Sequence, residues 1–481
     1  MNGLLDPLLQ IVLVPLVSAL GFVLIASWRI ASWLNIAVSG LTFLNALRLV
    51  QGGAREGEYL FADDLNLFFV LLTSFVAFTT SLFSAKYIAV EIERGNLSPR
   101  LARFYHAMYQ SLLFGMLLAL LANNIGVMWV AVELATLSTI SIVGLYQTPE
   151  GLEAAWKYFI LGSVGIALAL FGTILIYMAA EPVVGEGYHA MVWNVLTDNA
   201  AAFSPRLLNV AFVFLILGYG TKLGLVPVHG WLPDAHGEGP TPVTAVLSGL
   251  MLNVALYAVL RFKMLLSLNA GAIAPGPILM TLGMASLTFA AFMLYRRDDI
   301  KRLFAYSSIE HMGLIAIAFG IGGHVANFAG LLHVAMHSLT KSAIFFCVGH
   351  IAQFARTQKM SRIHGLTQSY PLLGWMLVIS VIAIVGLPPF GLFTSEFLIV
   401  QAALTLHPAI AVLIVLLLLV AFAALMLRLT GLAFGEPHGH FETQTVAIVP
   451  MVLHLSLVLS AGLFIPAQLT AWIERIARLL G

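Results

Sequence analysis

The chain has 481 residues, of which 60% are hydrophobic and 9% are charged, and its formal net charge is +1. Soluble domains carry about 25% charged residues, so this composition excludes a soluble or disordered protein, and without a basic tract nothing supports nucleic-acid binding. The single cysteine, Cys347, excludes an internal disulfide framework and a four-cysteine iron–sulfur or zinc site.

A membrane-spanning helix needs about 20 mainly apolar residues. By this criterion the sequence predicts an all-α polytopic membrane protein with about fourteen spans, forming a single membrane domain over residues 1–481. The start, MNGLLDPLLQ, has no basic residue and indicates a retained first span, not a cleaved signal peptide. The expected spans are 7–26, 30–49, 65–85, 106–122, 124–146, 156–179, 208–228, 241–265, 274–295, 303–322, 325–353, 371–395, 403–432 and 446–470.

An even number of spans places both termini on the same side of the membrane. With the termini outside, fourteen of the 23 lysines and arginines fall on the inner side and seven on the outer side. The remaining two, Lys222 and Lys341, lie inside spans. Because basic residues concentrate on the cytoplasmic side, we expect both termini to face outward, the periplasmic side of a bacterial inner membrane.

Two of the expected spans are interrupted by glycine and proline. One contains KLGLVPVHGWLPD (222–234) and the other contains GLPPFGLFTSEF (386–397). Paired interruptions in corresponding positions are typical of transporters built from inverted repeats around a midplane site. The sequence therefore predicts two inverted five-helix repeats, approximately residues 106–265 and 274–432, with broken seventh and twelfth helices.

A lysine lies in the first of these interrupted spans. An ammonium group near the bilayer centre costs about 2.5–3.5 kcal/mol on translocon scales, so Lys222 indicates an ion or proton site. Glu133, within the apolar run NNIGVMWVAVELATLSTISIVGL, is its expected partner. A close carboxylate would keep the lysine protonated, and separation would release its proton. The alternative is that Glu133 is a carboxylic acid kept neutral by burial.

A second titratable stripe lies in LLHVAMHSLTKSAIFF (331–346). His333, His337 and Lys341 are spaced four residues apart, so they share one helix face over about 12 Å. Each histidine could instead simply hydrogen-bond neighbouring helices. A haem would need a histidine on a second helix, and zinc is disfavoured because no cysteine or carboxylate completes the ligand set.

Further polar residues surround the two interruptions. Glu396 follows the second interruption and is expected to act as a relay. Glu310 and His311 are also expected to belong to the proton pathway, although Glu310 could instead be a helix-end carboxylate at the inner rim. After the first interruption, four residues would either pass protons inward or cap the next helix: His229, Asp234, His236 and Glu238. The charged run 296–302 is expected to be a solvated inner loop.

At these motifs the chain resembles the antiporter-like membrane subunits of respiratory complex I, multisubunit sodium/proton antiporters and group 4 membrane-bound hydrogenases. The matching stretches are WVAVELATLSTI (129–140), KLGLVPVHGWLPDAHGEGPTPVTAVLSG (222–249), DDIKRLFAYSSIEHMGL (298–314) and GLPPFGLFTSEF (386–397). The resemblance covers nearly the whole chain, and it implies a fourteen-helix fold with a central polar axis.

The resemblance also implies roles for individual residues. Glu133 would be the fifth-helix glutamate and Lys222 the seventh-helix lysine, while His337 and Lys341 would belong to the linking path and Glu396 to the twelfth-helix exit. In the eighth helix, many family members have a lysine or histidine where this chain has Asn253, a departure that leaves the central relay to water or to the eleventh helix.

SSIEHMG together with Asn253 is most similar to the hydrogenase-4 component F and formate hydrogenlyase branch. The alternatives are a complex I fourth-type subunit, a sodium/proton antiporter subunit and a non-conducting membrane scaffold. We expect a proton-translocating subunit of a redox-driven complex, without metal or cofactor of its own. Its expected partners are hydrogenase-like large and small subunits, further antiporter-like subunits and the lipid bilayer.

Overall fold

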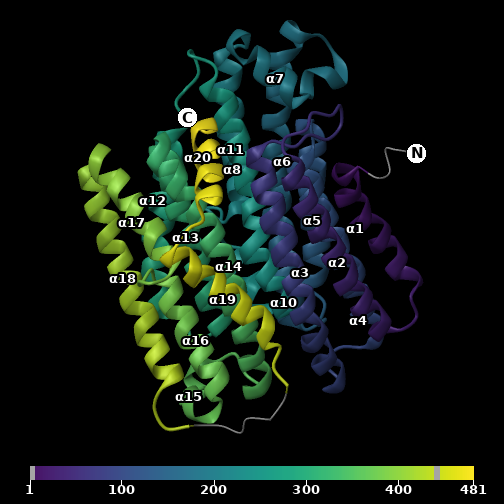
Figure 1. The fold of residues 1–481 in the computed structure, drawn as a ribbon, viewed down its shortest axis with the longest axis vertical. Helices are drawn as coiled ribbons and strands as arrows, with labels where there is room; N and C mark the ends of the chain where they lie inside the picture. The colour runs from purple at the N-terminus through teal and green to yellow at the C-terminus, as the bar shows by residue number, and fades with distance from the viewer. Residues whose placement is uncertain (1–5, 438–444) are drawn as a thin grey trace.

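The computed structural model describes residues 6–437 and 445–481, which form helices and no strand. The long helices run roughly side by side, with the N-terminal helices on one flank and α16 to α18 on the other (Figure 1). The first ten helices are α1 (Pro7–Leu24), α2 (Trp28–Gly52), α3 (Asp64–Glu93), α4 (Pro99–Leu121), α5 (Ile125–Val143), α6 (Pro149–Val184), α7 (Trp193–Asn199), α8 (Pro205–Leu223), α9 (Leu232–Glu238) and α10 (Thr241–Val246).

A π-helical turn, Leu247–Met251, joins α10 to α11 within one continuous span. The remaining helices are α11 (Leu252–Ser267), α12 (Gly276–Met293), α13 (Ile300–Ile321), α14 (Gly323–Ala355), α15 (Leu366–Ser369), α16 (Pro371–Ile384), α17 (Gly391–Leu406), α18 (Pro408–Ala433), α19 (Ile448–Leu463) and α20 (Ala467–Leu479).

Twelve helices of the described residues are long and apolar enough to cross a membrane, or thirteen if α19 and α20 count as one bent span. This confirms the all-α polytopic class. The span expected at 371–395 is divided between the shorter apolar helices α16 and α17, because the Gly–Leu–Pro–Pro segment ends one helix before the next begins. The span expected at 446–470 is bent by 82° between α19 and α20.

Local sequence signals explain several helix starts. Ser98 and Thr148 each accept a backbone N–H bond at the N-terminus of α4 and α6, and a proline follows each of them at the first helical position. Asn124 caps α5 by accepting bonds from the N–H groups of Gly126 and Val127, just after the expected end of the fourth span.

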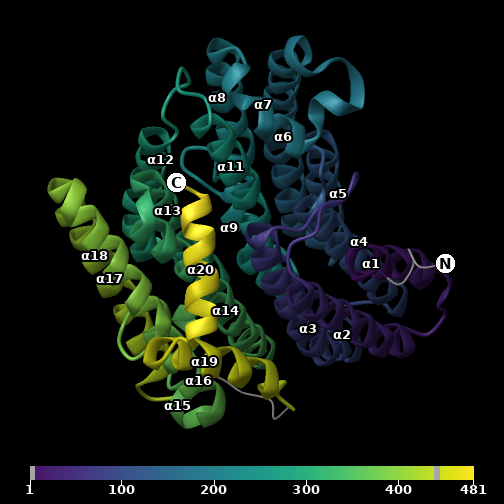
Figure 2. The ribbon, with the colours of Figure 1, turned by 45° about the horizontal axis from the view of Figure 1, so that its top comes forward.

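Helix α14 lies near the middle of the bundle. It packs against α3, α10, α13, α16, α17, α19 and α20, and α20 crosses in front of it in Figure 2. Most side chains of α14 and α13 are buried, whereas α1, α2, α6 and α18 expose many large apolar side chains. The start of α1 and the end of the chain lie toward the same end of the molecule, the upper end in Figure 1.

Candidate functional site

Lys222 lies in the last turn of α8 and is completely buried. Its Nζ makes no hydrogen bond within the described part of the chain and lies 5.4 Å from the ring centroid of Tyr158. The ammonium fits against the backbone of α6, because a Cβ added to Gly162 would stand 2.7 Å from Nζ. The α6–α8 interface is built from small residues, which lets the two backbones approach closely.

Glu133 on α5 is the carboxylate whose charge acts on Lys222. No direct hydrogen bond or ion pair joins the two groups among the described residues, and the Oε2 atom of Glu133 is buried without a partner. The structure therefore brings the expected pair into one region, where neither group is bonded directly to another side chain of the described residues. Such an arrangement permits the lysine to gain and lose its proton without breaking a fixed salt bridge.

The chain after Lys222 leaves the helix at Gly224, whose φ of 78° is in the left-handed region. Backbone groups released by this break find side-chain partners: Trp231 Nε1 donates to the carbonyl of Thr221 at 2.7 Å, and Ser286 Oγ accepts from Val226 N–H at 2.9 Å. Trp231 also stacks on Tyr158 with a centroid distance of 4.2 Å. These contacts hold the broken segment in place and position Lys222 at its start.

Asn253 links the first half of the chain to α14. Its side-chain amide donates to the carbonyl of Gly249 and to the hydroxyl of Ser338, both at 2.7 Å. The carbonyl of Gly249 is accessible there because the preceding turn is π-helical. The position of the lysine or histidine of many family members is thus occupied by an uncharged bridge to the helix that carries His337 and Lys341.

Lys341 is fully buried on α14, and its Nζ donates to the carbonyl of Phe304 on α13 at 2.8 Å. The charge that acts on it is that of Glu310. Glu310 lies in the middle of α13, almost completely buried, so the interpretation of Glu310 as a rim carboxylate is wrong. The reason is that α13 begins at Ile300, three residues before the expected start of the span, which places Glu310 deeper in the helix.

The two predicted histidine positions His311 and His333 are in direct contact. His311 Nδ1 lies 3.0 Å from His333 Nε2, and His333 Nδ1 lies 2.9 Å from Ser395 Oγ. The carboxylate of Glu396 lies 3.9 Å from His311 Nδ1. The two rings are stacked with centroids 5.1 Å apart, which leaves no space for a porphyrin between them. This cluster of α13, α14 and α17 could hold a metal ion.

His337 is buried beside this cluster, with its ring centroid 5.4 Å from that of His311. Neither ring nitrogen of His337 has a hydrogen-bond partner in residues 6–437 and 445–481. The expectation that His333 and His337 merely bond neighbouring helices therefore fails for His337. His337 lies one helical turn from Lys341 on one side and from His333 on the other, as their spacing predicted.

The four polar residues after the first interruption do not form one cluster. Asp234 and Glu238 form ion pairs with Arg302 at 2.9 and 3.0 Å. His236 is fully buried and its Nδ1 lies 2.8 Å from the carbonyl of Leu232, whereas His229 packs against the ring of Phe289. None of these side chains caps α10, so that expectation is wrong.

The charged run 296–302 is only partly solvated, contrary to expectation. Lys301 is buried and its Nζ donates to the carbonyl of Gly239 at 2.7 Å. Asp299 caps α13, and its burial raises the pKa of its carboxyl group. Beside Lys301, a polar cavity of about 830 Å³ is lined by residues that include Glu91, Glu238 and Gln353. Sequence reasoning missed Lys301 and Glu91 because charges near helix ends are usually solvated.

A second feature that sequence reasoning missed is a buried ion pair at the opposite end of the bundle. Arg261 makes two bonds of 2.7 Å to the carboxylate of Asp63, and three aromatic rings surround the guanidinium at 4.9–5.2 Å. Arg261 was expected on the outer side, as one of the seven basic residues counted there. Because Asp63 caps α3 and Arg261 lies on α11, the pair ties these two helices together.

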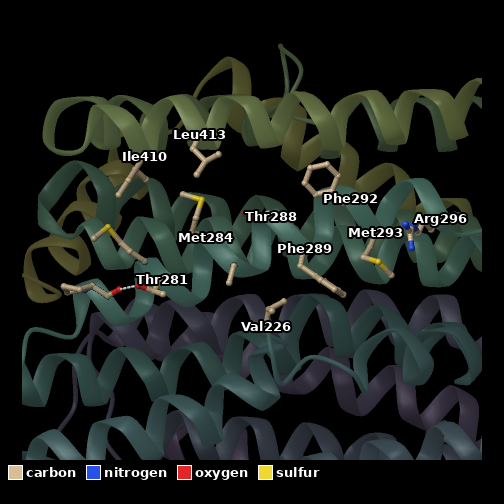
Figure 3. A pocket seen from close by; sticks show the side chains of 13 residues that line it. Val226, Thr281, Met284, Thr288, Phe289, Phe292, Met293, Arg296, Ile410 and Leu413 are labelled. Atoms are coloured by element: carbon tan, nitrogen blue, oxygen red, sulfur yellow. Dashed lines mark hydrogen bonds between the residues drawn. The ribbon is translucent and has the colours of Figure 1, made fainter.

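The structure also has an apolar groove of about 1020 Å³ between α12 and α18. Figure 3 shows Leu413 of α18 facing Met284 and Phe292 of α12, with Arg296 at one end and Val226 on the opposite side. The groove contains none of the predicted proton-pathway residues. The titratable side chains instead lie buried between helices, so the candidate site is the internal axis and not this groove.

Comparison with known proteins relates this arrangement to other membrane subunits. The family model described as "NADH:quinone oxidoreductase/Mrp antiporter, TM" matches residues 122–432. The hydrogenase-4 component F homolog of Methylacidiphilum infernorum (isolate V4) is 56% identical over 470 residues, covering 98% of this chain and 99% of that protein. This bears out the predicted resemblance to hydrogenase-4 component F.

More distant proteins are also similar to this chain, in sequence or in fold. Subunit M of the NADH-quinone oxidoreductase of Escherichia coli (strain K12) is 26% identical over 448 residues, covering 86% of this chain and 84% of that subunit. A chain of the membrane-bound sulfane sulfur reductase, an archaeal respiratory membrane complex, superposes with a TM-score of 0.85 at 23% identity. That alignment covers 98% of this chain and 97% of the other.

Proposed function

We propose that this chain, which belongs to the NADH:quinone oxidoreductase/Mrp antiporter transmembrane family, moves protons across the membrane as one subunit of a redox-driven complex. It is a multi-pass membrane protein, an antiporter-like subunit of the kind found in complex I, Mrp and hydrogenase-4 assemblies. The observation that carries the proposal is the buried ammonium of Lys222, near Glu133 but bound directly to no side chain of the described residues.

The pair of Lys222 and Glu133 can supply the free energy needed to move one proton against the membrane potential. Moving one charge across about 150 mV costs about 3.5 kcal/mol, at about 2.3 kcal/mol per 100 mV. Since about 1.4 kcal/mol corresponds to a factor of ten, the proton affinity of Lys222 must change by about 300-fold during a cycle. A change in its distance from Glu133, acting inside a poorly solvated interior, supplies an effect of this size.

The path continues through the second half of the chain. From Lys222 the proposed route passes Asn253 to Lys341, which Glu310 partners, and then His337. It reaches the His311–His333 pair and leaves at Glu396. His229, beside the first break, is the remaining residue of the proposed set. The contacts of Asn253 with Ser338 and of His311 with His333 support this order.

The decisive experiment replaces Lys222 with methionine, which keeps the side chain's length and removes its charge. Proton translocation by the assembled complex, measured with a pH-sensitive dye in proteoliposomes, should fall at least tenfold while electron transfer between partner subunits persists. Lys86→Met is the matched control, because Lys86 is exposed and, among the described residues, its Nζ donates to the carbonyl of Val446. Undiminished pumping by Lys222→Met would make the proposal wrong.

We further propose that the complex is of the group 4 hydrogenase or formate hydrogenlyase type, on the basis of the 56% identical hydrogenase-4 component F homolog. Purification from the native membrane should then recover hydrogenase-like large and small subunits and further antiporter-like subunits. Recovery of NADH- and quinone-linked subunits would instead favour a complex I assembly. A chain that exchanges sodium for protons without redox partners would be an antiporter.

A non-conducting scaffold is the candidate function from another class, and Asn253 is the observation that favours it. The uncharged bridge from Asn253 to Ser338 would interrupt a chain of titratable groups unless water completes it. Normal assembly together with absent proton translocation in the wild-type complex would establish the scaffold.

We propose two inverted repeats, residues 106–265 and 274–432, because corresponding helices of the two halves pack against corresponding neighbours. Helix α4 packs on α5 and α12 on α13; α6 packs on α8, and α14 on α16 and α17.

We also place both termini outside a bacterial inner membrane. In a Cys347→Ser background, a cysteine introduced at Lys359 should react only with reagents added to the inner side.

A further inference from the structure

Three side chains that are far apart in the sequence converge where α13, α14 and α17 meet. His311 Nδ1 and His333 Nε2 are 3.0 Å apart, and Glu396 Oε1 lies 3.9 Å from His311 Nδ1. Within the described residues, they are the one group of three histidine, cysteine or acidic side chains whose potential ligand atoms all lie within 4.8 Å of one another while two members are fully buried.

The hydrogen bonds of His333 bear on which of its two ring nitrogens carries the proton and which presents a lone pair to the cluster. Ser395 Oγ lies 2.9 Å from the carbonyl of Leu392 and 2.9 Å from His333 Nδ1. When its hydroxyl donates to that carbonyl, Ser395 Oγ accepts the bond from His333 Nδ1. That bond assigns the proton to Nδ1 and leaves Nε2 unprotonated, directed at His311. A histidine held through its outer N–H by a neighbouring group is the usual arrangement at protein metal sites.

The spacing of the donor atoms fits a small transition-metal ion. Zn²⁺ binds imidazole nitrogen and carboxylate oxygen at about 2.0–2.2 Å, so two donors at a tetrahedral angle stand about 3.4 Å apart. The two distances on His311 Nδ1, 3.0 and 3.9 Å, bracket this value. The sequence argument against zinc was that no carboxylate completes the histidines of 331–346, and α17 provides that carboxylate.

We propose that His311, His333 and Glu396 form a binding site for a divalent transition-metal ion of the zinc type, with water in the fourth position. His311 must then present Nδ1 as a lone pair and carry its proton on Nε2, and Glu396 must be ionised. Any proton on Glu396 leaves to solvent as the metal binds. Imidazole and carboxylate together favour zinc-type ions over Mg²⁺, which requires oxygen ligands.

Glu396 is the member through which an ion would reach the site. Its side chain is 11% exposed, compared with 2% for His311. Its carboxylate packs directly on Gly386 in the second break, where φ is 69° and a Cβ would overlap the carboxylate. Pro388 and Pro389 of the same break are exposed.

A bound metal ion would occupy the nitrogen lone pairs and the carboxylate that proton transfer at this point requires. The ion would thus inhibit proton translocation. This inhibition rests on the proposed function, whereas binding of the metal ion does not depend on it. Binding and inhibition are therefore measured separately, so that failure of one is distinguishable from failure of the other.

The test uses the purified complex containing the full chain, first freed of metal by chelation and then titrated with Zn²⁺ in equilibrium dialysis. We expect one tight site per chain that Glu396→Gln and His333→Gln each weaken at least 100-fold. Ser395→Ala should weaken it about tenfold, since it only orients His333. His337→Gln is the matched control, a buried histidine one turn away, and should bind Zn²⁺ as the wild type does.

X-ray absorption at the zinc edge of the wild-type complex needs no variant and should show two imidazole ligands and one carboxylate. Mg²⁺ at the same concentration should not compete. Zinc binding that is unchanged in Glu396→Gln and His333→Gln, or equally lost in His337→Gln, would overturn the assignment, as would a spectrum without imidazole. Tight binding at these ligands without any effect on translocation would preserve the site and contradict the proposed exit path.

Discussion

The Nζ atom of Lys222 lies against Gly162, at a point only 2.7 Å from where a Cβ on that glycine would stand. The glycine is therefore part of the space that the ammonium occupies. Since Gly162 is on α6 and Lys222 on α8, small movements of one helix relative to the other alter the position of the charge.

Gly162→Ala should consequently displace the Lys222 ammonium. We expect proton translocation to fall at least fivefold, because a shift of the charge changes its distance from Glu133. Gly172→Ala is the matched control: it crowds Leu215 in the same α6–α8 interface but does not touch Lys222. The measurement is the proton translocation rate of both variants in proteoliposomes. If Gly172→Ala lowers the rate as much as Gly162→Ala does, the effect is due to helix packing alone.

Replacement of Arg261 by leucine should destabilise the protein strongly. It leaves the carboxylate of Asp63 without its partner. Breaking a fully buried pair costs about 3–5 kcal/mol, and because the Asp63 side chain is 29% exposed we expect a loss toward the lower end of this range. Arg475→Leu is the control, because Arg475 pairs with Asp64, the residue next to Asp63. The Arg475 side chain is 58% exposed, and exposed pairs contribute about 0–1 kcal/mol to stability. Thermal unfolding in detergent measures both, and similar losses would contradict the role of burial.

The same pair predicts a dependence of stability on pH. Burial raises the pKa of Asp63, but the adjacent Arg261 guanidinium and backbone N–H bonds outweigh it, so the pKa lies below its ordinary value of 3.8. The contribution of Asp63 is therefore fully present well above pH 3.8 and is lost as the pH falls through the lower folded-state value. Wild-type unfolding should become easier in that acidic range, with a smaller change in Asp63→Asn.

Asn253→Leu tests the bridge between the two halves. Loss of the bonds to Gly249 and Ser338 should cost about 1–3 kcal/mol of stability. If the bridge serves the relay, translocation should also fall at least tenfold in the folded complex. Gln110→Leu likewise removes two buried amide bonds, to Asn35 and Ser39, away from the proposed path, and provides the control. A stability loss without slower translocation would exclude Asn253 from the path.

Glu310→Gln removes the negative charge that acts on Lys341 while keeping the shape of the side chain. We expect translocation to slow at least tenfold, because Lys341 would lose the group that stabilises its protonated form. Glu150→Gln, at an exposed position at the start of α6, should have no effect. Wild-type rates in Glu310→Gln would place Glu310 outside the route.

Much of the architecture was predictable, because membrane helices reveal themselves through local composition. Apolar runs located the long helices, and the glycine and proline of 222–234 and 386–397 located both breaks. The division of the span at 371–395 is the second of these breaks. The prediction was wrong at 446–470, which was expected as one span, because α19 and α20 are set at 82° to each other and α20 begins only after Pro466.

The candidate site was predictable residue by residue but not as a geometry. A charged residue within an apolar stretch can be recognised from the sequence alone, so Lys222, Glu133 and Lys341 were predicted. Lys301 did not, because its burial depends on the carbonyl of Gly239, 62 residues away. The buried pair of Asp63 and Arg261 was missed for the same reason, since the two residues are 198 positions apart.

The sequence by itself determined that this chain lies in a membrane, where two of its helices are interrupted and which charges lie within apolar runs, because the cost of placing polar groups in lipid acts on every segment separately. Only the tertiary structure decided which of those groups meet. His311, His333 and Glu396 come from three helices, and their contact depends on how α13 and α17 pack against α14. Helix packing depends on side-chain shape over the whole bundle, which no local pattern encodes.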